Sequence, residues 1–255
     1  MTDTVRLGGM ALGNGVLVHG PTAWACAIRT GDGELKVAAR RKRFRAAQVR
    51  NPLLRGPAKL AEAFALLPQV KRELPEAELP MQRPQVAASM VVSAAALQLA
   101  RRSALGPAAR ELLTAALSVA PAAFALRGGE LAAYHGAEHM SIGAYEHGRA
   151  RPKEHERCGS HLVGPMLVTT AAGNLVAERA PERYRPAARA LAALGAVAAS
   201  VETFGWMTRN PKHPLARALA RPGHELQHRV GTREPTPEQL EVAEAALAAC
   251  LELER

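Results

Sequence analysis

Four apolar segments constrain the fold of this chain more than any other feature of its sequence. They are rich in alanine and almost free of charge, and they cover residues 84–100, 112–126, 162–177 and 187–204. A short turn with charged residues separates the two members of each pair, so the sequence predicts two helical hairpins. Because aromatic residues make up only 4% of the chain, closely packed helices are favoured over a β-sandwich.

The length of these segments leaves two interpretations open. At 15 to 18 residues they fall at or just below the length of about 20 that crosses a bilayer, and alanine contributes little to insertion. They are therefore either membrane-spanning segments or buried helices of a soluble bundle. If they insert, an even number of crossings puts residues 128–160 on the same side as the basic run 36–59. The positive-inside rule marks that side as cytoplasmic. The alternative is a soluble cytoplasmic protein.

The N-terminal part has the pattern of a β-meander. Gly8 and Gly9 open a region, residues 5–39, that holds short apolar runs and a glycine-containing turn at 30–33. Small strands with several glycines often lie where backbone approaches another group closely, or they only form tight turns. We expect a mainly α (α+β) fold, with the meander and basic run in residues 1–50 and a helical region in 51–255, integrated into one domain. Outside the apolar segments the expected helices are 57–72, 130–147, 215–230 and 238–253.

The most informative motif lies on the expected helix 130–147. His135 and His139 are four residues apart, so their imidazoles project from one helical face, with Glu138 beside them. This H-x-x-E-H pattern is typical of inverted zincins, in which two histidines bind a metal and the glutamate acts as general base. Glu146 falls in the same stripe. A protein core would tolerate these ionisable groups only if they were paired or metal-bound.

Three further residues extend the set of candidate ligands. His155 and Cys158 are three apart in a short loop, and Glu202 interrupts the apolar stretch 190–204. Glu202 is interpreted as a third ligand, a counter-ion or a residue at the wet end of its segment. Zinc is the expected ion. If His155 and Cys158 both join His135 and His139, they close a four-ligand structural shell that leaves no position for water.

The net charge of +10 indicates an anionic partner. Nine basic residues form one run without an acidic residue: Lys36, Arg40, Arg41, Lys42, Arg43, Arg45, Arg50, Arg55 and Lys59. An anionic membrane surface is the favoured partner. Nucleic acid is less well supported, because Phe44 is the only aromatic residue in the run that could stack on a base. A basic membrane- or RNA-binding scaffold without catalysis is therefore a third interpretation. Three scattered cysteines indicate a reducing compartment.

Several segments together resemble a known family. They include Tyr-His-Gly-Ala-Glu-His at 134–139, Arg-Cys-Gly at 157–159 and Thr-Arg-Glu-Pro at 232–235. The chain is similar to the YqhQ-like family (domain of unknown function 1385), bacterial proteins labelled as metal-dependent enzymes that often carry membrane segments. The resemblance implies a metal-dependent enzyme. With the motif, it predicts a zinc hydrolase of unknown substrate at the cytoplasmic membrane face. His135 and His139 would hold the ion with Cys158 or Glu202, and Glu138 would accept a proton from water.

Overall fold

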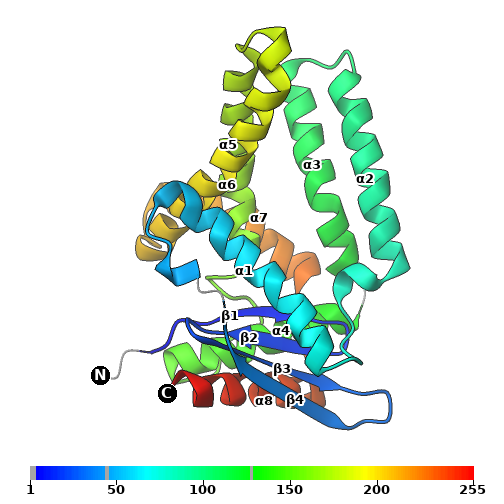
Figure 1. Ribbon diagram of the computed structural model, residues 1–255, viewed down its shortest axis with the longest axis vertical. Coiled ribbons are helices and arrows are strands. Elements are labelled where there is room, and N and C mark those ends of the chain that lie inside the picture. Colours follow the sequence, from blue (N-terminus) through cyan, green and yellow to red (C-terminus); the bar gives the residue numbers. More distant parts are fainter. Residues whose placement is uncertain (1–3, 44–45, 127–128) are drawn as a thin grey trace. The chain divides into compact units, whose positions relative to one another are not determined.

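The computed structural model describes residues 4–43, 46–126 and 129–255 (Figure 1). The chain forms two compact units. The first comprises Met1–Arg45, Phe64–His155 and Gln227–Arg255, and the second comprises Ala46–Ala63 and Glu156–Leu226. The helix-rich composition and the N-terminal strands agree with the α+β fold that the sequence predicts.

The first unit begins with a four-stranded antiparallel sheet in the order β1-β2-β3-β4. Its strands are β1 (Gly8–Ala11), β2 (Gly15–His19), β3 (Ala23–Arg29) and β4 (Leu35–Arg41). Gly9 pairs with Val18, and Leu17 pairs with Cys26. The β3–β4 turn contains Gly33 at φ 88°, a conformation that favours glycine. The β-meander predicted from the sequence is confirmed.

Helices of the same unit cover both faces of this sheet (Figure 1). On one face, side chains of β2 and β3 pack against α4 (Glu130–His147) and α8 (Pro237–Glu254). On the other face, Leu17, Trp24 and Ile28 pack against the C-terminal half of α1 (Pro52–Glu73). Alternate residues of a strand face opposite sides, so each strand contributes to both cores. As a result α4, the motif helix, lies on a rigid support.

The ends of α4 and α8 follow the local signals in the sequence. Gly148 caps α4 in the left-handed conformation, with φ 63°, which glycine adopts readily at the end of a helix. α8 begins at Pro237 after the N-cap Thr236, and the side chains of Thr236 and Gln239 form a capping box. A π-helical segment, Gln227–Gly231, precedes α8 in place of the last turn of the expected helix 215–230.

Both predicted hairpins are present. In the first unit α2 (Pro84–Arg102) packs against α3 (Pro107–Leu126), after the short 3-10 helix Pro80–Gln82. In the second unit α5 (Val163–Glu178) packs against α6 (Arg185–Arg209), and α7 (Pro214–Leu226) follows. Within the described residues one helix, Glu182–Arg209, is long and apolar enough to cross a membrane, with a mean hydropathy of 1.4. This is weak evidence for insertion, because a buried helix of a soluble protein can meet the same criterion.

Part of the basic run is neutralised within the first unit. Lys36 binds Glu76 at 2.7 Å, and Arg40 binds Glu73 at 2.7 Å. Lys42 is buried, and its Nζ lies 3.0 Å from His19 Nδ1. Burial, with a smaller contribution from Lys42, lowers the pKa of His19 to about 4, so this ring is neutral near pH 7. Phe44 and Arg45 lie outside the described residues.

Candidate metal centre

The helix α4 supplies four of the predicted site residues: His135, Glu138, His139 and Glu146. His139 is 2% exposed and Glu138 is 6% exposed, so the polar stripe faces the interior. The rings of His135 and His139 lie one turn apart, with centroids separated by 4.3 Å. The helical spacing thus brings the two rings together, as the sequence predicts.

Backbone carbonyl groups orient both imidazoles. His135 Nδ1 lies 2.7 Å from the carbonyl oxygen of Gly231, and His139 Nδ1 lies 2.6 Å from that of Lys153. A carbonyl oxygen only accepts, so in each ring Nδ1–H is the donor and a neutral ring carries its lone pair on Nε2. Metal-binding histidines in proteins are held in this way by an outer hydrogen bond to their second nitrogen.

Two glycines let these carbonyl-bearing segments lie directly on α4. A Cβ at Gly136 would come within 2.1 Å of the carbonyl oxygen of Arg233, and one at Gly143 within 3.1 Å of Arg151 Cβ. The N–H of Arg233 also donates to the carbonyl of Ala132 at 2.9 Å. Gly136, which costs helix propensity, is therefore required by close packing.

A third donor comes from the loop that follows α4. One ligand atom each from His135, His139 and Cys158 lie within 4.8 Å of one another, so this group could hold a metal ion. The N–H of Ser160 donates to Cys158 Sγ at 3.5 Å. Burial raises the pKa of this thiol, and the hydrogen bond from Ser160 partly offsets that effect.

His155 and Glu146 bind each other. Their side chains are each 11% exposed, with Nε2 of the histidine 3.2 Å from Oε2 of the glutamate. The ring of His155 lies 5.5 Å from that of His139, measured between centroids. Gln227, which is fully buried, fixes the backbone of His155 by accepting from its N–H at 2.9 Å and donating to its carbonyl at 3.3 Å.

The carboxylate of Glu138 lies against the first strand of the sheet. A Cβ at Gly9 would come within 2.3 Å of Glu138 Oε1, so only glycine leaves room for this side chain. Of the two interpretations of the glycine-studded strands, close approach of the backbone to another group therefore applies at Gly9.

Glu202 has a different partner. Within the second unit Arg55 donates from Nε to Oε1 at 2.9 Å and from Nη2 to Oε2 at 2.5 Å. Both carboxylate oxygens are engaged in this fork. The ion pair explains how α6 carries a carboxylate in an otherwise apolar stretch.

Comparison with family models places the motif in a known group. Residues 130–253 match the model of the family described as protein of unknown function (DUF1385). This part of the chain, slightly less than half of its length, is therefore similar to the DUF1385 family. The matched range begins at α4 and ends in α8, so the DUF1385 segment contains the histidine pair, Cys158 and the carbonyl groups that orient the rings. Comparisons with curated proteins and with solved structures gave no match.

Proposed function

We propose that this chain is a metal-dependent hydrolase that holds one zinc ion through His135, His139 and Cys158. The orientation of the two imidazoles carries this proposal. Both rings commit Nδ1–H to a backbone carbonyl and keep Nε2 as the ligand atom. Metal-binding histidines have this arrangement, in which an outer acceptor fixes Nδ1–H and the ring presents Nε2 to the ion.

The donor set fits zinc. Two imidazole nitrogens and one thiolate form a three-ligand set that zinc uses in catalytic sites, where a fourth position stays open to water or substrate. When bound there, the ion would supply Lewis acidity and lower the pKa of a bound water molecule. Cys158 suits the third position because it follows His155 by only three residues, and three residues span about 10 Å at most. The Cys158 thiol therefore stays near the two histidines of α4.

Glu138 and the pair His155–Glu146 would then have separate roles. Glu138, buried beside the histidines on α4 and packed on Gly9, would accept the proton of the attacking water. The hydrogen bond between His155 and Glu146 favours three protein ligands over four, since His155 Nε2 already has a partner. Glu202, whose oxygens both bind Arg55, is the weaker alternative to Cys158.

Cobalt substitution tests this ligand set. Protein loaded with Co²⁺ should show the intense visible absorption of a tetrahedral ion and a sulfur-to-cobalt charge-transfer band in the near ultraviolet. Cys158→Ser should lose the charge-transfer band, whereas Cys26→Ser should keep it because Cys26 lies in the sheet core. A spectrum without the band in the wild-type protein would contradict ligation by Cys158. Loss of metal in Glu202→Gln would assign the third position to Glu202.

The helical hairpins support a location at the cytoplasmic membrane, with the motif on the cytoplasmic side. α2 buries only Val86, Ser93 and Ala100, which are spaced by seven residues, and Val91 and Leu99 are each 70% exposed. In the second unit Leu191 and Val176 are 71% and 65% exposed. Helices that are apolar on all sides are suited to lipid. The 25 residues of α6, which lies within the segment that is long and apolar enough to cross a membrane, span about 38 Å, more than the hydrocarbon thickness of about 30 Å.

We therefore expect the protein to sediment with membranes and to require detergent for release. Electrostatic attachment alone is less well supported, because Lys36 and Arg40 are already paired with Glu76 and Glu73. The measurement is fractionation of cells expressing the full chain, with a high-salt wash before detergent. Release by salt would indicate a peripheral protein held by anionic lipid or nucleic acid. Recovery of monodisperse protein without detergent would contradict membrane association and leave the metal centre unaffected.

A further inference from the structure

The second unit carries a cationic surface at α7 and at the turn before it. Residues 209–226 contain one carboxylate, that of Glu225, against four cationic side chains: Arg209, Lys212, Arg217 and Arg221. All four are exposed, and none of them forms an ion pair with a residue that the structure describes. Glu202, the carboxylate of α6, already binds Arg55 through both of its oxygens. The cationic surface therefore remains available for an anionic partner.

The helix α7 has a fixed orientation on its neighbours in this unit. Its buried residues, Ala216 and Gly223, are seven positions apart and lie on one face. A Cβ at Gly223 would come within 2.4 Å of the carbonyl oxygen of Ser160, and one at Gly164 of α5 would come within 2.0 Å of that of Leu219. The backbone of α7 thus packs directly against the backbone around it. This contact decides which of its side chains point outward.

Cationic and apolar side chains flank the buried face of α7 on opposite sides. At about 100° per residue, Arg217 and Arg221 fall on one flank, and Leu215 and Pro222 fall on the other. The two arginines are four positions apart, so their side chains are neighbours, and Leu215 is 54% exposed. This division is typical of a helix that lies in a membrane interface, with its apolar side in the acyl boundary and its basic side among the headgroups.

The end of α6 adds an aromatic residue that suits the same location. The ring of Trp206 meets that of His213 at an angle of 68°, with centroids 5.1 Å apart. Tryptophan is enriched at membrane–water interfaces, and Trp206 follows the long apolar part of α6. It is the only tryptophan, tyrosine or phenylalanine in residues 205–226. Single-stranded nucleic acid is bound by several aromatic residues that stack on successive bases, so lipid is the favoured partner.

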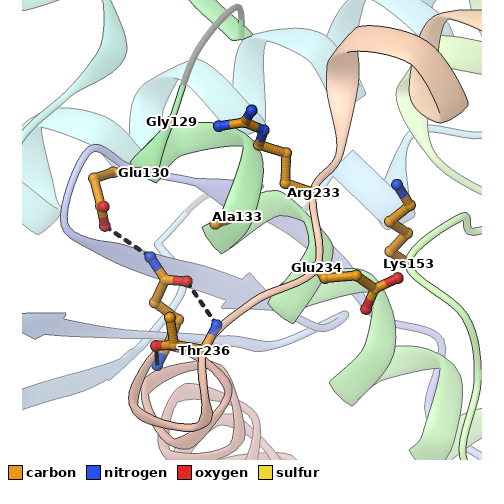
Figure 2. A pocket seen from close by; sticks show the side chains of 8 residues that line it. Gly129, Glu130, Ala133, Lys153, Arg233, Glu234 and Thr236 are labelled. Atoms are coloured by element: carbon orange, nitrogen blue, oxygen red, sulfur yellow. Dashed lines mark hydrogen bonds between the residues drawn. The ribbon is translucent and has the colours of Figure 1, made fainter.

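The pocket beside the N-terminal turn of α4 is less suited to an anion (Figure 2). Lys153 and Arg233 line this pocket in the first unit, but the carboxylates of Glu130 and Glu234 line it as well. Figure 2 shows the two cationic side chains on different sides, with the guanidinium of Arg233 directed towards Gly129. The charges of the pocket lining therefore balance, whereas those of α7 do not.

We propose that α7 binds the headgroups of anionic phospholipids at the membrane surface. Arg217 and Arg221 would bind the phosphate groups, because a guanidinium matches the geometry of a phosphate, and Leu215 would enter the boundary with the acyl chains. The proposal rests on the membrane location proposed above. It assigns the contact with anionic lipid to α7 in place of the basic run 36–59, part of which is paired with carboxylates.

Quenching of tryptophan fluorescence by brominated phospholipids tests this surface on the full chain. Of the two tryptophans, Trp24 is fully buried in the sheet, so Trp206 reports lipid contact near α7. In micelles of a neutral detergent, brominated phosphatidylglycerol should quench at a lower lipid fraction than brominated phosphatidylcholine. Arg217→Gln and Arg221→Gln should each raise the phosphatidylglycerol fraction that is needed about five-fold, the effect of one basic residue at an anionic surface.

A control variant makes the test specific for α7. Arg72→Gln removes the same charge from an exposed position of α1 in the first unit and should leave the quenching unchanged. Equal quenching by the two lipids, full quenching by phosphatidylglycerol in the double variant Arg217→Gln/Arg221→Gln, or an equal loss in Arg72→Gln would overturn the proposal. Binding of polyuridylate that the double variant loses, without a preference between the lipids, would assign the surface to nucleic acid and also overturn it.

The lipid surface and the membrane location can fail separately. A protein that needs detergent but shows no preference for phosphatidylglycerol would keep the membrane location and lose the α7 surface. A protein that is monodisperse without detergent would contradict insertion of the hairpins. In that case α7 is tested by flotation: the wild-type chain should float with phosphatidylglycerol vesicles and not with phosphatidylcholine vesicles, and the double variant should float with neither. Flotation of the double variant would overturn the proposal.

Discussion

His139→Ala is expected to strip the protein of most of its bound metal. The wild-type chain should retain about one transition-metal ion after purification without chelators, since a preformed site binds zinc tightly. Loss of an outer hydrogen-bond partner typically lowers metal affinity 10- to 100-fold. Removing a metal ligand itself should lower the affinity by more than this. The measurement is elemental analysis of the purified variant beside the wild type, followed by a competition titration with a chromophoric chelator.

A matched control lies on the same helix. His147 is exposed at the end of α4, and its Nδ1 donates to the carbonyl of Gly143 at 2.9 Å. His147→Ala should keep the full metal content. Because His139 is buried, circular dichroism must show that His139→Ala keeps its helices, and His139→Gln offers a less disruptive replacement. A folded His139→Ala protein with wild-type metal content would exclude the histidine pair as the site, and metal-free wild-type protein would exclude both the hydrolase and the structural metal protein.

The fold could be predicted in large part because its signals are local. The motif helix begins at Glu130 and ends at His147, where Gly148 adopts the left-handed conformation, and Pro237 starts the closing helix. The order of the strands followed from their short turns. The paths of the loops around α4 could not be predicted. These paths depend on Gly136, which is contacted by Arg233, and on Gly143, which is contacted by Arg151. Arg233 is far from Gly136 in the sequence, and a loop separates Arg151 from Gly143.

Only the part of the candidate site that consists of side chains could be predicted from the sequence. The spacing of His135 and His139 indicated the shared face, but the groups that orient them are the carbonyls of Gly231 and Lys153. A backbone carbonyl leaves no mark on residue type, so no pattern could identify these acceptors. Gln227 was likewise missed as the residue that fixes the backbone of His155, since a single buried amide resembles any surface glutamine in a sequence. Gln227 is the first residue of a π-helical segment. This distortion is visible in the structure but cannot be predicted from the periodicity of the sequence.

The second large effect is expected at Glu138. If this carboxylate accepts the proton of the attacking water, Glu138→Gln should lower hydrolysis by about 10²–10⁴-fold while the metal stays bound. Glutamine has nearly the shape of glutamate and fits the same space beside Gly9, so packing should change little. The assay uses metal-loaded protein with p-nitrophenyl acetate and p-nitrophenyl phosphate as probes, since they report ester and phosphate-ester cleavage directly.

Metal content measured beside activity decides which role Glu138 has. Loss of the ion in Glu138→Gln would make the carboxylate a ligand, because an amide oxygen binds zinc much less strongly than a carboxylate does. Glu252→Gln removes a carboxylate from an exposed position on α8 and should leave both readouts unchanged. Gly9→Ala gives an independent test: its added methyl group would lie within 2.3 Å of Glu138 Oε1 and must displace the carboxylate. A general base moved from its position should lower activity with the metal retained, whereas full activity in both variants would remove Glu138 from the mechanism.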